Sequence, residues 1–127
     1  MRVIPAPVVD HAVLRDLAGV GAGSGSAFVL ELVEVFAADA RGSLERMRGC
    51  ARSGDADALV REAHRLKGTS GTLGALRLAG ECLEIERRAR AGQCDGLEER
   101  VEGALTLLDA TRGGILDFFR GTIAQAA

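Results

Sequence analysis

One short segment, residues 63–75, combines a nucleophile, a cation and glycines in a pattern that suits transfer of a phosphoryl group. Neutral imidazole is a nitrogen nucleophile, and its unperturbed pKa of about 6.5 leaves most of it unprotonated at neutral pH. His64 therefore needs no separate base to accept the group. Lys67, the only lysine of the chain, follows three residues later, where its ammonium group can neutralise phosphate oxygens.

The glycines of this segment predict a surface cleared for another protein. Gly68 and Gly71 fall on the side of the expected helix that displays His64. Glycine inside a helix costs about 0.5–1 kcal/mol relative to alanine, so something else must be gained. We predict that a partner docks on this side, over Val60, Arg61, Gly68 and Gly71.

The segment that carries His64 and Lys67 is expected to be a helix. Asp55 can cap a helix that carries His64, with apolar residues recurring at three- and four-residue steps. His64 lies off this core stripe and so is expected at the surface. The stripe consists of Leu59, Ala63, Leu66, Ser70 and Leu73.

Four further helices are expected along the chain: a short one from Asp10 to about Ala18, then helices over 26–52, 76–91 and from Asp95 onward. The Gly- and Ser-rich segment 19–26 separates the first two, and Gly92 is a C-terminal cap candidate. The predicted core stripes are Val29, Val33, Phe36, Ala40, Leu44 and Met47; then Ala79, Cys82, Ile85 and Ala89; then Leu97, Val101, Ala104, Leu108, Thr111, Ile115 and Phe118.

Two features of these helices leave alternatives open. Phe28, Leu32 and Val35 form a second apolar strip, which either packs beneath the short first helix or meets a partner. Gly113 and Gly114 are candidate kink positions in the last helix.

The composition favours an all-α fold, because Ala, Leu, Arg and Glu are abundant while Trp and Tyr are absent. Long helices joined by short turns predict an antiparallel four-helix bundle with an additional short N-terminal helix. We expect residues 1–9 to form a linker or extended N-terminus, residues 10–122 the bundle, and residues 123–127 a tail.

Several function classes are disfavoured. The net charge of -2 lacks the basic excess that nucleic-acid binding needs. No apolar run reaches the length of a membrane span, and the start of the chain lacks the regions of a signal peptide. No phosphate-binding glycine motif accompanies a predicted strand, so ATP binding and kinase activity are not expected. Cys50, Cys82 and Cys94 form no close pair and are interpreted as buried thiols.

No metal site is predicted either, because His11 and His64 are distant in sequence. The carboxylates of the later helices are expected mostly to face solvent, namely Glu81, Glu84, Glu86, Glu98 and Glu99. Arg87, Arg88 and Arg90 are interpreted as a solvent-exposed helix end, where positive charge suits the helix dipole, with contact to an acidic partner as the alternative.

The segment "AHRLKGTSGTLGA" resembles the phosphorylation motif of the histidine phosphotransfer domains of two-component phosphorelays, and the resemblance runs from about Asp10 to Phe119. It implies that His64 is the phosphorylated residue, that Lys67 aids phosphate stabilisation and that Gly68 permits approach of a receiver domain. It further implies a carrier that relays a phosphoryl group between receiver aspartates and is not an enzyme. No cofactor is implied, since Mg²⁺ belongs to the receiver.

The expected partner is a receiver domain of a response regulator or of a hybrid sensor histidine kinase, met by a monomer without nucleic acid or direct membrane contact. The dimerising domains of sensor kinases fit less well, because they are helical hairpins that pair to make a bundle. A cytoplasmic location is expected, either free or as the cytoplasmic part of a membrane-bound hybrid sensor kinase. The alternative is a bundle that binds a receiver or kinase without being phosphorylated.

Overall fold

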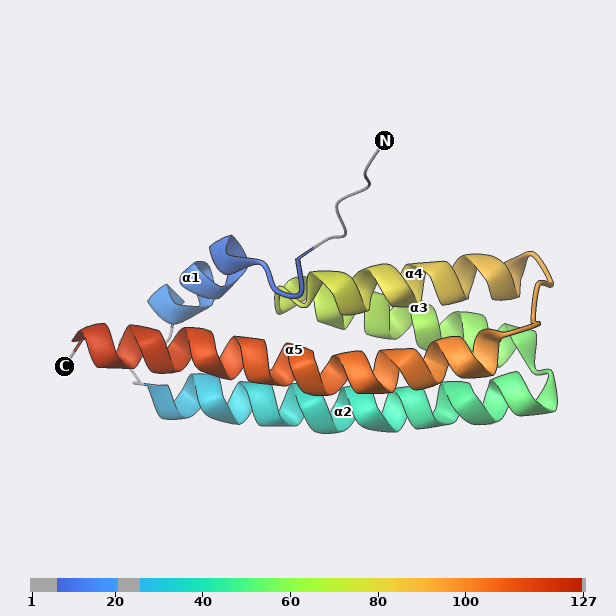
Figure 1. Ribbon diagram of the computed structural model, residues 1–127, viewed down its shortest axis with the longest axis horizontal. Coiled ribbons are helices and arrows are strands. Elements are labelled where there is room, and N and C mark those ends of the chain that lie inside the picture. Colours follow the sequence, from blue (N-terminus) through green and yellow to red (C-terminus); the bar gives the residue numbers. More distant parts are fainter. Residues whose placement is uncertain (1–6, 21–25, 127) are drawn as a thin grey trace.

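The computed structural model describes residues 7–20 and 26–126, and within these ranges the chain forms five helices and no strands (Figure 1). The helices are α1 (His11–Val20), α2 (Ser26–Ser53), α3 (Ala56–Thr72), α4 (Leu76–Arg90) and α5 (Leu97–Ala126). The predicted all-α class and the four-helix bundle with a short N-terminal helix are confirmed. The predicted break at 21–25 and residues 1–6 of the predicted linker lie outside the described residues.

The helix boundaries follow local sequence signals. The Asp10 carboxylate accepts a hydrogen bond from the backbone N–H of Ala12 at 3.0 Å and caps α1. The Asp55 carboxylate likewise accepts from the N–H of Ala58 at 3.1 Å and caps α3. Gly92, with a φ of +75°, ends α4 as expected. Helix α5 passes unbroken through Gly113 and Gly114 and extends into the segment assigned to the tail.

Each bundle helix packs on two neighbours, so that α2, α3, α4 and α5 form a closed ring in chain order. Helix α3 therefore lies between α2 and α4, with one side exposed. Every predicted core residue of α2 and α3 is buried, which fixes the rotation of both helices. On α4, Cys82, Ile85 and Ala89 are buried as predicted, but Ala79 is half-buried.

Helices α2 and α5 are longer than their neighbours, with 28 and 30 residues against 17 in α3 and 15 in α4. At 1.5 Å per residue, α2 extends roughly 16 Å further than α3. Helix α1 lies over this extension, as Figure 1 shows. A second apolar cluster fills the space between α1, α2 and α5, and comprises Leu14, Val29, Val33, Ile115, Leu116 and Phe119.

This extension explains why the predicted seam of α5 was wrong at its end. Phe119 and Leu116 are buried, whereas Phe118 is half-buried and stacks at 5.6 Å, between ring centroids, on His11. From Ile115 onward, α5 packs against α1 and α2 instead of against α4 and α2. A different set of α5 residues is therefore buried there. Sequence periodicity alone does not reveal that change of partner.

The turn between α3 and α4 also anchors the N-terminal segment. Gly74 has a φ of +75°, which favours glycine, and its carbonyl accepts a hydrogen bond from the backbone N–H of Asp10 at 2.7 Å. A Cβ at this position would lie 3.2 Å from the carbonyl oxygen of Asp10 and 3.3 Å from Val13. Glycine is therefore required both for the turn and for the close approach of the start of α1.

The predictions about the second apolar strip, the cysteines and membrane spans have separate outcomes. Leu32 of the second apolar strip packs against the main core, whereas Phe28 and Val35 stay exposed. Cys82 is a buried thiol, and burial raises its pKa to about 12, but Cys50 and Cys94 are only half-buried. No helix of the described ranges combines the length and apolar character that crossing a membrane demands.

Candidate functional site

His64 lies on the exposed side of α3, where its side chain is 66% accessible to solvent. Ala63 and Leu66 on either side of it in the sequence are buried, so packing of α3 between α2 and α4 holds the imidazole at the surface. This matches the expectation that the histidine lies off the core stripe. The imidazole is therefore both fixed in position and open to a second molecule.

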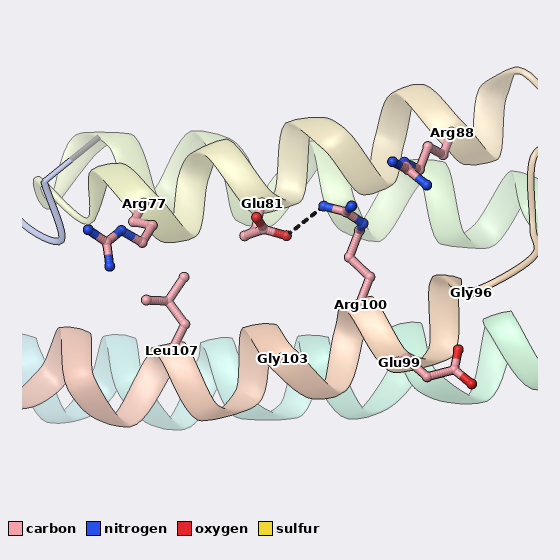
Figure 2. Close-up of a pocket in the computed structure, with 8 residues that line it drawn as sticks. All are labelled: Arg77, Glu81, Arg88, Gly96, Glu99, Arg100, Gly103 and Leu107. Carbon is pink, nitrogen blue, oxygen red and sulfur yellow. Dashed lines mark hydrogen bonds and ion pairs between the residues drawn. The ribbon is translucent and has the colours of Figure 1, made fainter. Parts of the chain in front are cut away.

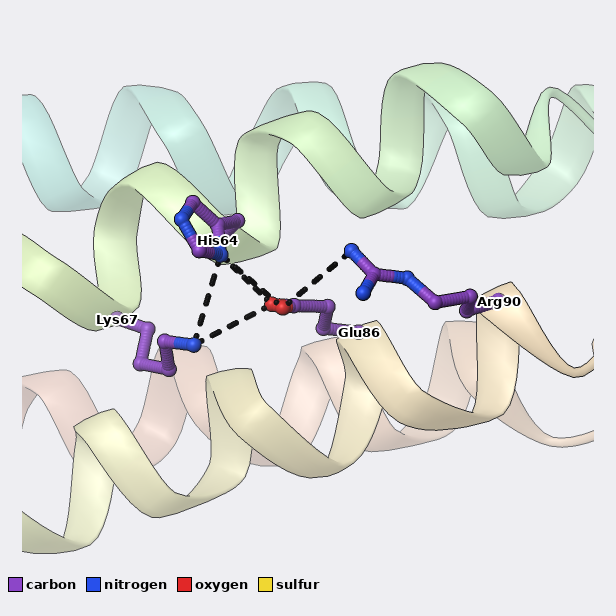
Figure 3. Close-up of polar contacts among 4 residues, drawn as sticks. All are labelled: His64, Lys67, Glu86 and Arg90. Atoms are coloured by element: carbon purple, nitrogen blue, oxygen red, sulfur yellow. Dashed lines mark hydrogen bonds and ion pairs between the residues drawn. The ribbon is translucent and has the colours of Figure 1, made fainter.

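A buried carboxylate on the neighbouring helix holds the imidazole. Nδ1 of His64 lies 2.9 Å from Oε1 and 3.2 Å from Oε2 of Glu86, which projects from α4 (Figure 3). The Glu86 side chain is only 5% exposed. The prediction that Glu86 faces solvent with the other helix carboxylates was therefore wrong. A signal was present, because Glu86 follows Cys82 by four residues and precedes Ala89 by three, which places it on the buried stripe.

Two cations share the Glu86 carboxylate. Nζ of Lys67 lies 3.4 Å from Oε1 and 3.5 Å from Nδ1 of His64. A guanidinium nitrogen of Arg90, one turn after Glu86 on α4, lies 3.8 Å from Oε2. Figure 3 shows the carboxylate between these two side chains, with His64 on the adjoining helix. The structure thus joins the two predicted chemical residues, His64 and Lys67, through a residue that was not predicted.

The charge of Glu86 determines which imidazole nitrogen is available. Burial raises the pKa of Glu86, but hydrogen bonds from His64 and Lys67 and the charge of Lys67 outweigh burial, and the net pKa lies below the ordinary value. Glu86 is thus an ionised hydrogen-bond acceptor at neutral pH. An ionised carboxylate can only accept, so in the neutral His64 ring Nδ1 is the donor and Nε2 keeps its lone pair.

A different ionic network holds the opposite side of α3 on α2. Glu62 of α3 accepts hydrogen bonds from Ser43 Oγ at 2.7 Å and from Arg46 at 2.9 Å. Burial raises the Glu62 pKa, but these hydrogen bonds lower it by more, and the net pKa is below the ordinary value. Arg65 pairs with Asp39 of α2 at 3.1 Å. These contacts fix the register of α3 against α2.

The predicted docking residues all lie at the surface near His64. Gly68 and Gly71 are exposed, and a Cβ added to either would meet nothing within 4 Å. The protein's own packing therefore does not require glycine at these positions. Val60 is half-buried against the core, while Arg61 is exposed and lines a shallow hollow of about 190 Å³ with Ala58, Glu62 and Arg65.

A groove of about 530 Å³ lies between α4 and α5 (Figure 2), but none of the predicted site residues lines it. Arg100 spans it to reach Glu81 at 3.1 Å. The part of the chain that the structure describes contains no cluster of three His, Cys, Asp or Glu side chains suited to a metal ion. The two histidines have separate environments, since His11 stacks on Phe118 and His64 bonds to Glu86.

Comparison with known protein families then assigns the chain. The Hpt domain family matches residues 31–114, which include α3, α4 and all four residues of the histidine site. The chain belongs to the Hpt domain family. As an Hpt domain it is similar to a crystal structure of histidine-containing phosphotransfer protein B from Pseudomonas aeruginosa PAO1, with 31% identity and a TM-score of 0.77.

That structural match covers 91% of this Hpt domain and 97% of the other chain, so it spans the bundle almost completely. A comparison with curated protein sequences found no significant match. The predicted family is confirmed, and both positive findings support a role in histidine phosphotransfer.

Proposed function

We propose that this chain carries a phosphoryl group on Nε2 of His64 and relays it between aspartates of receiver domains. The observation that supports this most strongly is an exposed imidazole whose Nδ1 is hydrogen-bonded to a buried, ionised carboxylate at 2.9 Å. An inert surface histidine has no need of such a partner. The family match to Hpt domains supports the same chemistry.

The transfer step follows from the tautomer that Glu86 favours. The lone pair of Nε2 forms the N–P bond while the bond between phosphorus and the receiver's aspartate oxygen breaks, and the aspartate leaves as a carboxylate. The ring then carries positive charge, which Glu86 stabilises through the proton retained on Nδ1. In the onward step the N–P bond breaks and the ring leaves as neutral imidazole, a better leaving group than its anion.

Lys67 is proposed to neutralise the phosphoryl oxygens. It lies on α3 one turn after His64, and its Nζ is 3.5 Å from the ring. An ammonium group on a flexible stem serves as a movable point charge. This chain needs no nucleotide site in such a scheme, because the phosphoryl donor is the charged receiver. The receiver also supplies the Mg²⁺ that positions the group.

The docking surface is proposed to centre on the glycine side of α3. Open space above Gly68 and Gly71 would let a receiver's active-site rim reach the imidazole, with Val60 and Arg61 on the other side of His64 as further contacts. Receiver active sites are acidic, so the basic side chains near His64 favour this approach through charge complementarity.

The test is a phosphotransfer assay with receivers charged by acetyl phosphate. Wild type is expected to acquire acid-labile, alkali-stable phosphate, and His64→Gln is expected to lose it. His11→Gln is the matched control, since it removes the other histidine, on α1, and should be labelled as wild type is. Absence of label on wild type with every receiver of the same genome would contradict the proposal and favour a bundle that only binds its partners.

A further inference from the structure

We propose that Arg90 is a positioning residue whose charge on Glu86 releases Lys67 to bind the phosphoryl group. This inference rests on the proposed function, because it concerns the phosphorylated state of His64. The buried Glu86 carboxylate faces two cations from opposite sides, Lys67 and Arg90 (Figure 3). A single cation would suffice to neutralise Glu86.

In the unphosphorylated protein, Lys67 is paired with Glu86. Its Nζ is 3.4 Å from Oε1 of Glu86 and 3.5 Å from Nδ1 of His64, the nitrogen that is not the nucleophile. Phosphoryl oxygens on Nε2 would lie on the other edge of the ring. Lys67 must therefore leave the carboxylate in order to neutralise them.

Leaving has an energetic consequence for Glu86. The carboxylate is 5% exposed, and a buried charge that loses a partner is strongly destabilised unless another group replaces it. The phosphorylated ring is positively charged and keeps its Nδ1–H on Glu86, but the phosphoryl group brings a larger negative charge close to it. A second cation must then balance Glu86 for the movement of Lys67 to be favourable.

Arg90 is placed for that task. Its guanidinium is 3.8 Å from Oε2, whereas Lys67 is hydrogen-bonded to Oε1, and 66% of the Arg90 side chain is exposed. The side chain therefore has room to close to hydrogen-bond distance when Lys67 departs. Glutamate four residues before arginine is also the favourable orientation for such a pair on a helix.

The neighbouring arginines provide the contrast. Arg87 and Arg88 both pair with Glu84, at 3.2 Å and 2.9 Å, and neither has an ion pair with Glu86 in the described residues. The three arginines lie at the solvent-accessible end of α4, as the sequence suggested, but they pair with different glutamates. Arg87, which is 71% exposed in the same last turn of α4, is a matched control for Arg90.

The decisive measurement is the equilibrium constant for phosphoryl exchange between this chain and one receiver that labels it. That constant depends only on the free phosphorylated and unphosphorylated proteins, so contacts made during docking cancel. We expect Arg90→Gln to shift the equilibrium toward the receiver by about two- to fivefold, as for loss of one partly exposed ion pair. Arg87→Gln should leave it unchanged, and Arg90→Lys should restore most of it.

A double-mutant cycle tests the mechanism itself. In a Lys67→Ala background there is no lysine to release, so Arg90→Gln should have no further effect on the equilibrium. An undiminished effect in that background, or no effect of Arg90→Gln in wild type, would overturn the inference. Neither result touches the proposed carrier function, which fails only if wild-type His64 takes up no phosphate.

Discussion

A glutamate with a lowered pKa lies at each interface of α3, Glu62 of α3 itself toward α2 and Glu86 of α4 on the other side. The two sites differ in what surrounds the carboxylate. Glu62 on the α2 side is hydrogen-bonded by Ser43 and Arg46, which are a hydroxyl and a permanent cation. Glu86 on the α4 side is bonded by His64 and Lys67, a nucleophile and a flexible amine. Glu62 therefore fixes a helix, whereas Glu86 fixes a reactive ring.

Burial of a carboxylate between helices therefore does not by itself indicate chemistry. Both glutamates are held against the cost of desolvation by hydrogen bonds and opposite charge. What distinguishes them is whether a partner keeps a free lone pair directed at solvent. Nε2 of His64 does, whereas the Arg46 guanidinium has no lone pair to offer and the Ser43 hydroxyl is fully buried.

Exchange of each carboxylate for its amide should separate the two roles most clearly. In Glu86→Gln the amide can donate to Nδ1 as well as accept, so the tautomer is no longer specified, and transfer to His64 should slow by about 10- to 100-fold, as for other residues that orient a reactive group. Glu62→Gln should transfer at the wild-type rate. Phosphotransfer kinetics measure the rates, and nitrogen NMR of the imidazole reports the tautomer. Equal rates in both variants would remove the distinction between the sites.

Two exposed glycines, Gly68 beside His64 on α3 and Gly103 on α5, should separate docking from stability. A Cβ at position 68 meets no atom within 4 Å, and Gly68→Leu replaces a weak helix former, so the free energy of unfolding should rise by about 0.5–1 kcal/mol. The side chain would nevertheless obstruct a receiver, and transfer should slow about tenfold, which corresponds to about 1.4 kcal/mol. Gly103→Leu on α5, equally open, should gain stability with unchanged transfer. Unimpaired transfer by Gly68→Leu would place docking elsewhere.

Acid should weaken both networks. Each glutamate has a folded-state pKa below its ordinary value, so the unfolded chain binds these protons more readily. Their contribution to stability is therefore complete above the ordinary glutamate range and is lost as pH falls through the folded-state pKa. Urea unfolding at pH 7 and near pH 4 is expected to show this loss, and Glu62→Gln should reduce it. A variant with the same pH dependence as wild type would exclude Glu62 as a contributor.

Sequence periodicity predicted the bundle well, because a helix stripe is a local property. The stripes of α2 and α3 and the capping roles of Asp10 and Asp55 depend on residues within a few positions of one another. His64 was expected at the surface for the same reason. What a stripe faces in three dimensions is not local, and the end of α5 was wrong because α1 replaces α4 there.

The site was only partly predictable for a related reason. His64 and Lys67 share one helix, and their spacing alone indicated chemistry. Glu86 lies 22 residues after His64 on another helix, and residue type suggested solvent although its spacing matched the buried stripe. Only the pairing of α3 with α4 brings the two together. The separation of Arg90 from Arg87 likewise depends on which glutamate each one reaches.

Two fully buried serines differ in whether their hydroxyl makes a hydrogen bond, and their replacement should have the smallest effects on stability. Ser43 Oγ donates to Glu62, whereas Ser70 Oγ has no hydrogen-bond partner in the part of the chain that is described. Ser43→Ala should cost about 1 kcal/mol of unfolding free energy, because it removes a bond to a charged acceptor.

Ser70→Ala removes a buried hydroxyl that makes no hydrogen bond, and alanine has a higher helix propensity than serine. Stability should therefore be unchanged or rise by about 0.5 kcal/mol. Urea denaturation of the two variants beside wild type measures the difference. A loss of stability in Ser70→Ala as large as that in Ser43→Ala would mean that the Ser70 hydroxyl is satisfied after all. The buried hydroxyl of Ser70 on α3 would then be hydrogen-bonded, as that of Ser43 on α2 is.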